Sequence, residues 1–167
     1  IPLGDLIRDM VKFFDLPMSS FSKGKQDQPL LKMRGEPLAT SICYEDSFGE
    51  ELIRQLPEAT LLINGSNNAW YGDSFAPHQH LQIAQMRALE TGRMLLRATT
   101  NGISAVIDHK GKVVARSPQF ESYVITYSVR PRTGATPYVR WGNWPVISLA
   151  FLLLFGAIIY TNKTKNT

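Results

Sequence analysis

The sequence ends in a long uncharged apolar run that limits what this chain can fold into. Residues 141–160 read WGNWPVISLAFLLLFGAIIY and contain no charged side chain. As an α-helix this run would be about 30 Å long, which matches the hydrocarbon core of a bilayer. Trp141 and Trp144 stand at one end and Tyr160 at the other, where amphipathic rings favour membrane interfaces. We therefore expect a transmembrane helix over 141–160 and a short basic tail over 161–167. A buried core helix is the alternative.

The composition predicts one folded domain in front of this run. Of the 167 residues, 44% are apolar and 19% are charged, which supplies a core and argues against a disordered chain. Cys43 is the single cysteine, so the chain has no internal disulfide and no CxxC-type metal site. No HExxH-like pattern occurs, and we expect no metal and no cofactor. The net charge of +4 is scattered and does not predict nucleic-acid binding.

Strand-like and helix-like segments alternate along residues 1–140. Strands are expected at residues 38–43, 60–64, 94–100, 103–108, 112–116 and 123–129. Helices are expected at residues 5–14, 48–56 and 77–91, the second capped by Asp46 or Ser47 and the third ended by Gly92. This order predicts an α/β fold whose sheet is parallel at its centre and carries helices on its faces.

Cys43 stands where the first of these strands turns into a helix. Such a corner lies at the carboxyl end of a sheet, where open α/β folds bind ligands. A helix N-terminus aimed at the sulfur would favour the thiolate, and the N–H groups of the turn could hold an oxyanion. The alternative is a small buried hydrophobic residue. A nucleophile also needs a proton acceptor, and the only histidines, His78, His80 and His109, have no spacing that identifies one. We interpret them as surface or capping residues.

Five motifs then point to a known family. They are Cys-Tyr-Glu at 43–45, Asn-Asn-Ala-Trp at 67–70, His80, Arg-Ala-Leu-Glu at 87–90 and Thr-Asn-Gly at 100–102. Together they resemble the nitrilase-type, or carbon–nitrogen hydrolase, superfamily, and within it the apolipoprotein N-acyltransferases. The order of a nitrilase domain followed by a membrane helix also resembles the apolipoprotein N-acyltransferases. The resemblance covers nearly the whole chain. It implies that residues 1–140 are the carboxyl-terminal portion of a nitrilase-like αββα sandwich.

The resemblance implies a bacterial inner-membrane enzyme that is multi-pass when complete and has its catalytic domain in the periplasm. Such enzymes take an acyl chain from a phospholipid, hold it as a cysteine thioester, and pass it to the amino group of a diacylglyceryl-cysteine lipoprotein. The phospholipid, the lipoprotein and the membrane would be the partners, without nucleic acid. By this resemblance Cys43 is the nucleophile, and Tyr44 and Glu45 are its active-site neighbours. Arg8 stands where the family has a functionally important arginine, and we expect it to bind substrate.

Two further expectations complete this interpretation. Trp70 and Tyr71 lie on a long loop and are expected to contact the acyl substrate, although simple packing of the loop is an alternative. The chain begins at Ile1 without an initiator Met, so we expect the family's Glu and Lys to lie upstream and the chain alone to be inactive. The family uses a catalytic triad of Glu, Lys and Cys, and we do not assign Lys23, Lys25 or Lys32 of this chain to it. The competing functions are a membrane-tethered nitrilase or amidase that transfers its acyl group to water, and a non-catalytic tail-anchored domain.

Overall fold

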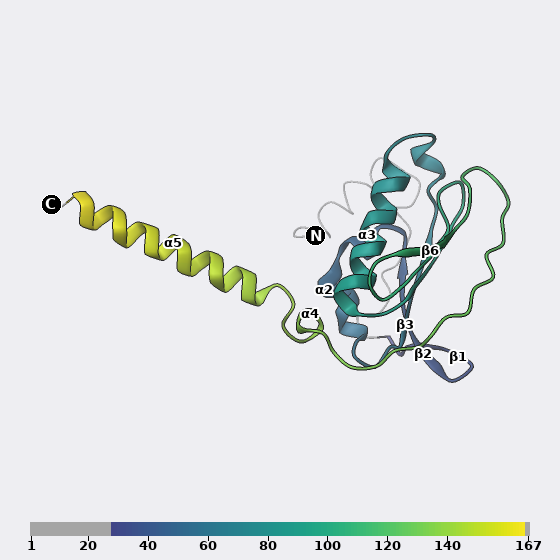
Figure 1. Ribbon diagram of the computed structural model, residues 1–167, viewed down its shortest axis with the longest axis horizontal. Helices are drawn as coiled ribbons and strands as arrows, with labels where there is room; N and C mark the ends of the chain where they lie inside the picture. The colour runs from purple at the N-terminus through teal and green to yellow at the C-terminus, as the bar shows by residue number, and fades with distance from the viewer. Residues whose placement is uncertain (1–27, 166–167) are drawn as a thin grey trace, which may run out of the picture.

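A mixed six-stranded β-sheet organises residues 28–165, the part of the chain that the computed structural model describes (Figure 1). The strands are β1 (Leu31–Met33), β2 (Glu36–Ile42), β3 (Leu61–Ser66), β4 (Leu95–Thr99), β5 (Ala105–Ile107) and β6 (Val113–Arg116). They lie in the sheet in sequence order. β2, β3 and β4 are parallel, whereas β1, β5 and β6 pair antiparallel with their neighbours. The expected parallel centre and the hairpin that follows it are confirmed.

Helical segments, most of them short, connect the strands, and one long helix follows the domain. They are η1 (Cys43–Ser47), α2 (Gly49–Leu52), η2 (Ile53–Gln55), η3 (Ala69–Tyr71), α3 (Ala76–Thr91), α4 (Pro137–Trp141) and α5 (Trp144–Lys165). α3 confirms the helix expected at 77–91, and Gly92 ends it in the left-handed conformation with φ 66°. The helix expected at 5–14 lies outside the described residues.

Both faces of the central strands are buried, which explains their nearly continuous apolar sequence. On one face, Leu62 of β3 packs in a cluster with α3 side chains such as Leu81 and Ala84. On the other face, Leu61 packs with Met94. Helices α2 and α3 therefore cover the first face, as Figure 1 shows. The second cluster combines strand side chains with Met94, Ile125 and Val129 from outside the strands.

Two expected elements differ from the structure. Of the helix expected at 48–56, residues 49–55 are helical, but as the short α2 followed by the 3-10 turn η2, and Phe48 (φ −100°, ψ 80°) stands before α2 as its N-cap. Asp46 does not cap a helix there, since its carboxylate is taken by two buried side chains described below. The strand expected at 123–129 is also wrong. That segment is extended without strand pairing, and it lays Ile125 and Val129 against the second face of the sheet.

Residues 130–143, which we call the strap, run along the domain to the start of α5. The Arg132 N–H donates to the Thr60 carbonyl at 3.1 Å, and the Thr136 hydroxyl donates to the Glu90 carbonyl at 2.6 Å. Arg93 Nη2 donates to the Gly134 carbonyl at 2.7 Å. The strap is therefore tied to the sheet and to α3 before the chain leaves the domain.

α5 projects away from the domain (Figure 1). Residues 144–161 have a mean hydropathy of 2.0 and none of them is buried. Within the described part of the chain, α5 is the single helix that is long and apolar enough to cross a membrane by length and composition. Helical conformation starts at Trp144 rather than at Trp141, because Gly142 with φ 54° separates α4 from α5.

Candidate active site

Cys43 occupies a strained position at the carboxyl end of β2. Its φ of 52° lies in the left-handed region, which non-glycine residues rarely adopt and which persists only where neighbours enforce it. Two hydrogen bonds provide that enforcement. The Ile42 N–H donates to Glu45 Oε2 at 2.6 Å, and Asn64 Nδ2 donates to the Cys43 carbonyl at 3.1 Å. Cys43 forms no disulfide and the residue is partly exposed, so the turn leaves it partly open to solvent.

A buried charged network lies directly beneath this turn. Asp46 is fully buried and bonds to two side chains, Arg97 Nη1 at 3.2 Å and His80 Nε2 at 2.9 Å. Arg97 Nη1 also donates to Asn64 Oδ1 at 2.8 Å. The Asn64 amide thus links the guanidinium to the Cys43 carbonyl. Because buried charges are stable only when paired, this network fixes η1 and the turn against β3 and β4.

The electrostatics of the network centre on Arg97. Burial lowers the pKa of the Arg97 guanidinium, whereas the Asp46 carboxylate and then Cys43 oppose that shift. The ion pair with Asp46 favours the charged guanidinium despite its burial.

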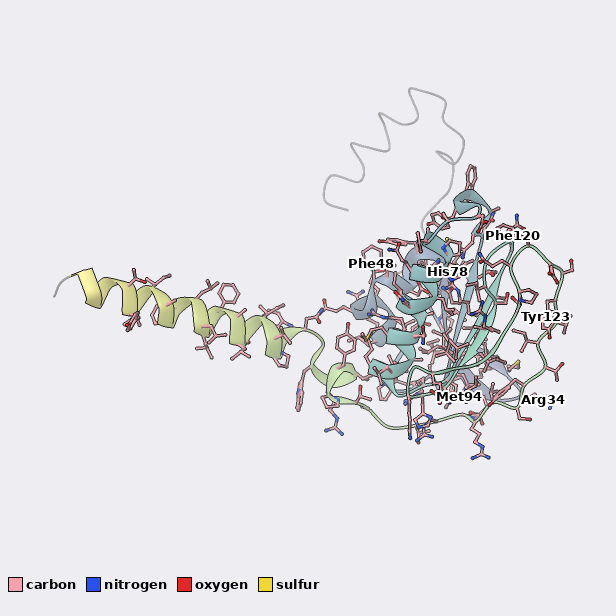
Figure 2. All side chains as sticks on the ribbon, turned by 45° about the horizontal axis from the view of Figure 1, so that its top comes forward. Arg34, Phe48, His78, Met94, Phe120 and Tyr123 are labelled. Atoms are coloured by element: carbon pink, nitrogen blue, oxygen red, sulfur yellow. The ribbon has the colours of Figure 1, made fainter. Side chains whose placement is uncertain are left out.

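His80 is the clearest correction to the sequence interpretation. It is not a surface or capping residue, because it is buried on α3 and bonded to Asp46. His78, two residues earlier, is exposed on the same helix (Figure 2), and His109 is partly exposed in the β5–β6 turn. Helical spacing turns residues two apart in different directions, which accounts for the contrast between His78 and His80.

The loops after β3 and β4 meet at the edge of the sheet where Cys43 lies. Ile42 pairs with Gly65, and Gly65 pairs with Ala98, so the three parallel strands end together. The Thr100 hydroxyl donates to Asn67 Oδ1 at 2.7 Å. Asn68 is buried against Gly102, where an added Cβ would lie only 2.5 Å from Asn68 Nδ2. The Asn-Asn-Ala-Trp and Thr-Asn-Gly motifs therefore form one packed unit.

Exposed aromatic side chains follow the ends of β2 and β3. Tyr44 contacts Phe48 edge to face, with ring centroids 5.8 Å apart. On the loop after β3, Trp70 is 85% exposed and Phe75 is 84% exposed, and Tyr71 is also exposed. The structure thus places Trp70 in solvent rather than against the domain. Such exposed apolar rings suit contact with a lipid or a partner.

The other residues predicted for the site are Arg8 and Glu45. Arg8 lies outside the described residues. Glu45 acts on the backbone of the turn through its bond to Ile42. Over residues 28–165, no group of three or more His, Cys, Asp or Glu side chains could hold a metal ion. In that same range, no basic side chain hydrogen-bonds the Cys43 thiol. The ion pair between Asp46 and Arg97 was not predicted, because nothing in the spacing of the two residues along the sequence indicates that they pair.

Comparison with known proteins identifies close relatives of this sequence. The chain is 49% identical to an apolipoprotein N-acyltransferase of Methylococcus capsulatus over 99% of its length. It is 49% identical to that of Nitrosomonas europaea over 100% and 48% identical to that of Azotobacter vinelandii over 95%. These alignments cover 32%, 34% and 31% of the respective relatives. The chain thus spans about a third of the length of these proteins.

Solved structures show the same fold. A carbon–nitrogen hydrolase superfamily protein of Xanthomonas campestris, with an arsenic adduct in its active site, superposes with a TM-score of 0.53 at 16% identity. The superposition covers 66% of this chain and 46% of that one. A carbon–nitrogen hydrolase of Helicobacter pylori gives 0.50 at 15% identity over 59% and 42%. The family described as carbon–nitrogen hydrolase matches residues 6–138. This chain therefore belongs to the carbon–nitrogen hydrolase family.

Proposed function

We propose that this chain supplies the acyl-carrying cysteine of a lipoprotein N-acyltransferase. Cys43 would take a fatty acyl chain from a phospholipid and pass it to the amino group of a diacylglyceryl-cysteine lipoprotein. The observation that carries the proposal is the strained, partly exposed Cys43 at the end of β2, held by Glu45 and Asn64. The relatives named apolipoprotein N-acyltransferase support the choice of acceptor.

The proposed reaction has two acyl transfers. In the first, the Cys43 sulfur attacks an ester carbonyl of the phospholipid, a C–S bond forms, and the C–O bond to glycerol breaks. The thiol proton passes to the departing glycerol oxygen, which leaves a lysophospholipid. In the second, the lipoprotein amine attacks the thioester carbonyl, a C–N bond forms, and the C–S bond breaks. One amine proton returns to the sulfur, so the enzyme is regenerated without a cofactor.

The residues around Cys43 have separate roles in this proposal. Glu45 and Asn64 hold the turn, and the buried Asp46–Arg97 pair keeps that turn on the sheet. Tyr44, Trp70 and Tyr71 offer apolar surface to the acyl chain. The Glu and Lys implied by the family resemblance would move the protons, since no basic side chain within the described residues hydrogen-bonds the thiol. We therefore expect turnover only from the complete protein.

The membrane is the second part of the proposal. We place α5 across the bacterial inner membrane, with the domain on the periplasmic side and further membrane helices in the complete protein. A domain tethered at the bilayer surface meets lipid-borne substrates at a high effective concentration. Limited water at that surface would favour the amine over water as acceptor. The apolar and unburied surface of α5 supports this placement.

Trapping the acyl-enzyme tests the proposed function. The complete protein is incubated with a phospholipid that carries an alkyne-tagged acyl chain, and labelled peptides are mapped by mass spectrometry. We expect the label on Cys43, removable by neutral hydroxylamine as a thioester. Cys43→Ala should abolish the label, whereas Ser47→Ala in the same turn should retain it.

The acceptor distinguishes transfer from hydrolysis. Addition of a lipidated peptide with a free amino terminus should discharge the label into an amide product. Release of free fatty acid alone would instead indicate a membrane-tethered amidase. An unlabelled Cys43 in folded, lipid-supplied protein would refute the proposal altogether.

A further inference from the structure

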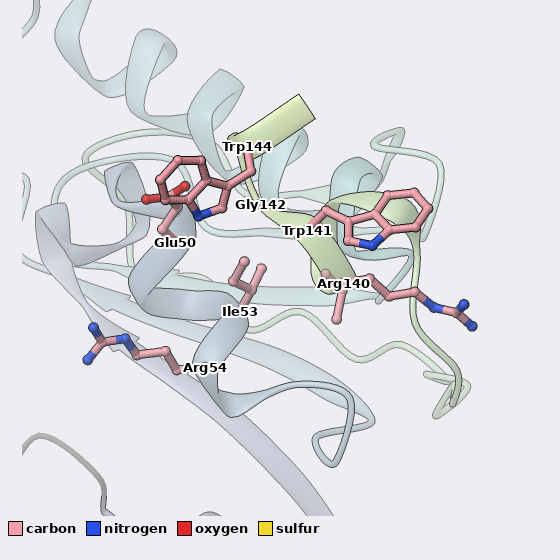
Figure 3. A pocket seen from close by; sticks show the side chains of 8 residues that line it. Glu50, Ile53, Arg54, Arg140, Trp141, Gly142 and Trp144 are labelled. Atoms are coloured by element: carbon pink, nitrogen blue, oxygen red, sulfur yellow. The ribbon is translucent and has the colours of Figure 1, made fainter. Parts of the chain in front are cut away.

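A groove lies where the domain meets α5, and none of the residues that line it belongs to the Cys43 turn, η1. It has a volume of about 560 Å³ and is formed by α2 and η2 on one side and by α4 and the start of α5 on the other. Ile53 and Val139 form its apolar floor, and the indole rings of Trp141 and Trp144 stand at its rim. Figure 3 shows the two tryptophans above this floor.

Two arginines line the same groove from opposite sides. Arg54 comes from η2 and Arg140 from α4, and their guanidinium groups extend outward in different directions (Figure 3). Both side chains are exposed. Among the described residues neither guanidinium has an ion-pair partner. The groove therefore combines unpaired positive charge with an apolar floor.

Glu50, the acidic residue that lines the groove, already accepts a hydrogen bond from the protein backbone. Glu50 Oε1 accepts the N–H of Asn143 at 3.1 Å, directly before α5 begins. An added Cβ on Gly142 would lie 3.0 Å from the same oxygen, so the strap passes close over Glu50. Because its carboxylate faces the N-terminus of α5, Glu50 fixes the position of the helix. The two arginines then leave a net positive charge for a ligand.

We propose that this groove binds membrane phospholipid at the bilayer surface, with lipid phosphates paired to the exposed guanidinium groups of Arg54 and Arg140 on its two sides. The groove opens at the start of α5, where the headgroup layer of a bilayer would lie. Tryptophan rings favour that layer, and arginine side chains place their charge in it while their stems cover apolar surface. Guanidinium groups bind phosphate through paired hydrogen bonds. The glycerol and first acyl carbons would lie on Ile53 and Val139.

This site is separate from the acyl-donor position at Cys43. The inference uses the membrane placement of α5 from the proposed function, but it does not use acyl transfer. A phospholipid here would hold the domain against the membrane and would not be consumed. Its binding should therefore survive the loss of the nucleophile.

Photocrosslinking from the floor of the groove tests the inference. The complete protein carries benzoylphenylalanine in place of Ile53 and is reconstituted in nanodiscs of phosphatidylcholine with increasing phosphatidylglycerol. We expect a phospholipid adduct at position 53, identified by mass spectrometry. Arg54→Gln with Arg140→Gln should weaken binding to phosphatidylglycerol by up to about 25-fold, since each of the two basic residues near an anionic surface strengthens binding about fivefold.

Two controls make the outcome specific. Arg34→Gln with Arg116→Gln removes the same charge elsewhere, and Figure 2 shows Arg34 on the side of the domain far from α5. This variant should crosslink like the parent protein. Cys43→Ala should also leave the adduct unchanged, which separates this site from acyl transfer. A crosslink to another segment of the protein in place of lipid would overturn the inference, as would an equal effect of both arginine pairs.

Discussion

Replacing Asp46 by Asn tests whether the buried network holds the Cys43 turn. The change keeps the shape of the side chain but removes the negative charge that faces Arg97 and His80. Removing one partner of a buried ion pair costs about 3–5 kcal/mol, because the remaining charge is left uncompensated. At about 2–4 °C for each kcal/mol, the unfolding temperature of the domain should fall by roughly 6–20 °C.

The assay compares thermal unfolding of the complete protein by circular dichroism with the rate at which Cys43 is labelled by acyl donor. Asp46→Asn should lower both, whereas Glu58→Gln, which removes an exposed carboxylate, should lower neither.

A double-mutant cycle then tests the reasoning itself. If the pair acts as a unit, Asp46→Asn combined with Arg97→Gln should cost less than the sum of the two single changes. Costs that add to within about 0.5 kcal/mol would show that Asp46 and Arg97 do not depend on each other. The account of the network given above would then be refuted.

Two further predictions concern stability. Burial raises the pKa of Glu90 to about 7, although Arg87 opposes the shift. Its protonated form therefore stabilises the fold below about pH 4.5, and that contribution is lost as pH rises through 7. Denaturant titrations should show that the free energy of unfolding is lower at pH 7.5 than at pH 5 by an amount on the order of 1–2 kcal/mol. Glu90→Gln should remove this difference. Gly102→Ala should cost about 1–3 kcal/mol through its clash with Asn68. Gly65→Ala, where a Cβ meets nothing within 4 Å, should cost clearly less, and equal losses would contradict the packing argument.

The sequence predicted the sheet better than the connections around it. The strands β2 and β3 and the helix α3 are marked by local apolar patterns and by Gly92, and these signals do not depend on distant residues. The helix expected at 48–56 is present only as the short α2 and η2, and its predicted Asp46 cap was wrong because Asp46 bonds to side chains 34 and 51 positions away. The segment at 123–129 failed because its apolar residues cover a face of the sheet rather than extend its edge.

The candidate site was predicted in the same uneven way. Cys43 was recognised from its place between a strand and a polar turn, and the structure adds the strained backbone that a sequence does not reveal. His80 was misread because its burial follows from a partner on another element. Glu45 was expected near the reacting sulfur, and its bond to Ile42 shows how it shapes the turn. Local sequence patterns thus do not predict which residues far apart in the sequence pair in the fold.

The anchoring of the strap couples the orientation of α5 to that of the domain. Arg93 hydrogen-bonds the carbonyls of Ala59 and Gly134, and Glu50 receives Asn143 where the helix begins, so the junction has little freedom to bend. Where α5 crosses a bilayer, a change in the tilt of α5 by about 20° would tilt the domain with it. An atom of the domain would then move by about 3–4 Å for every 10 Å that separate it from the start of α5. Bilayer thickness would then set the height of the cysteine above the lipid surface. Lipids of different chain length should change the rate of acyl transfer even when their headgroups are identical.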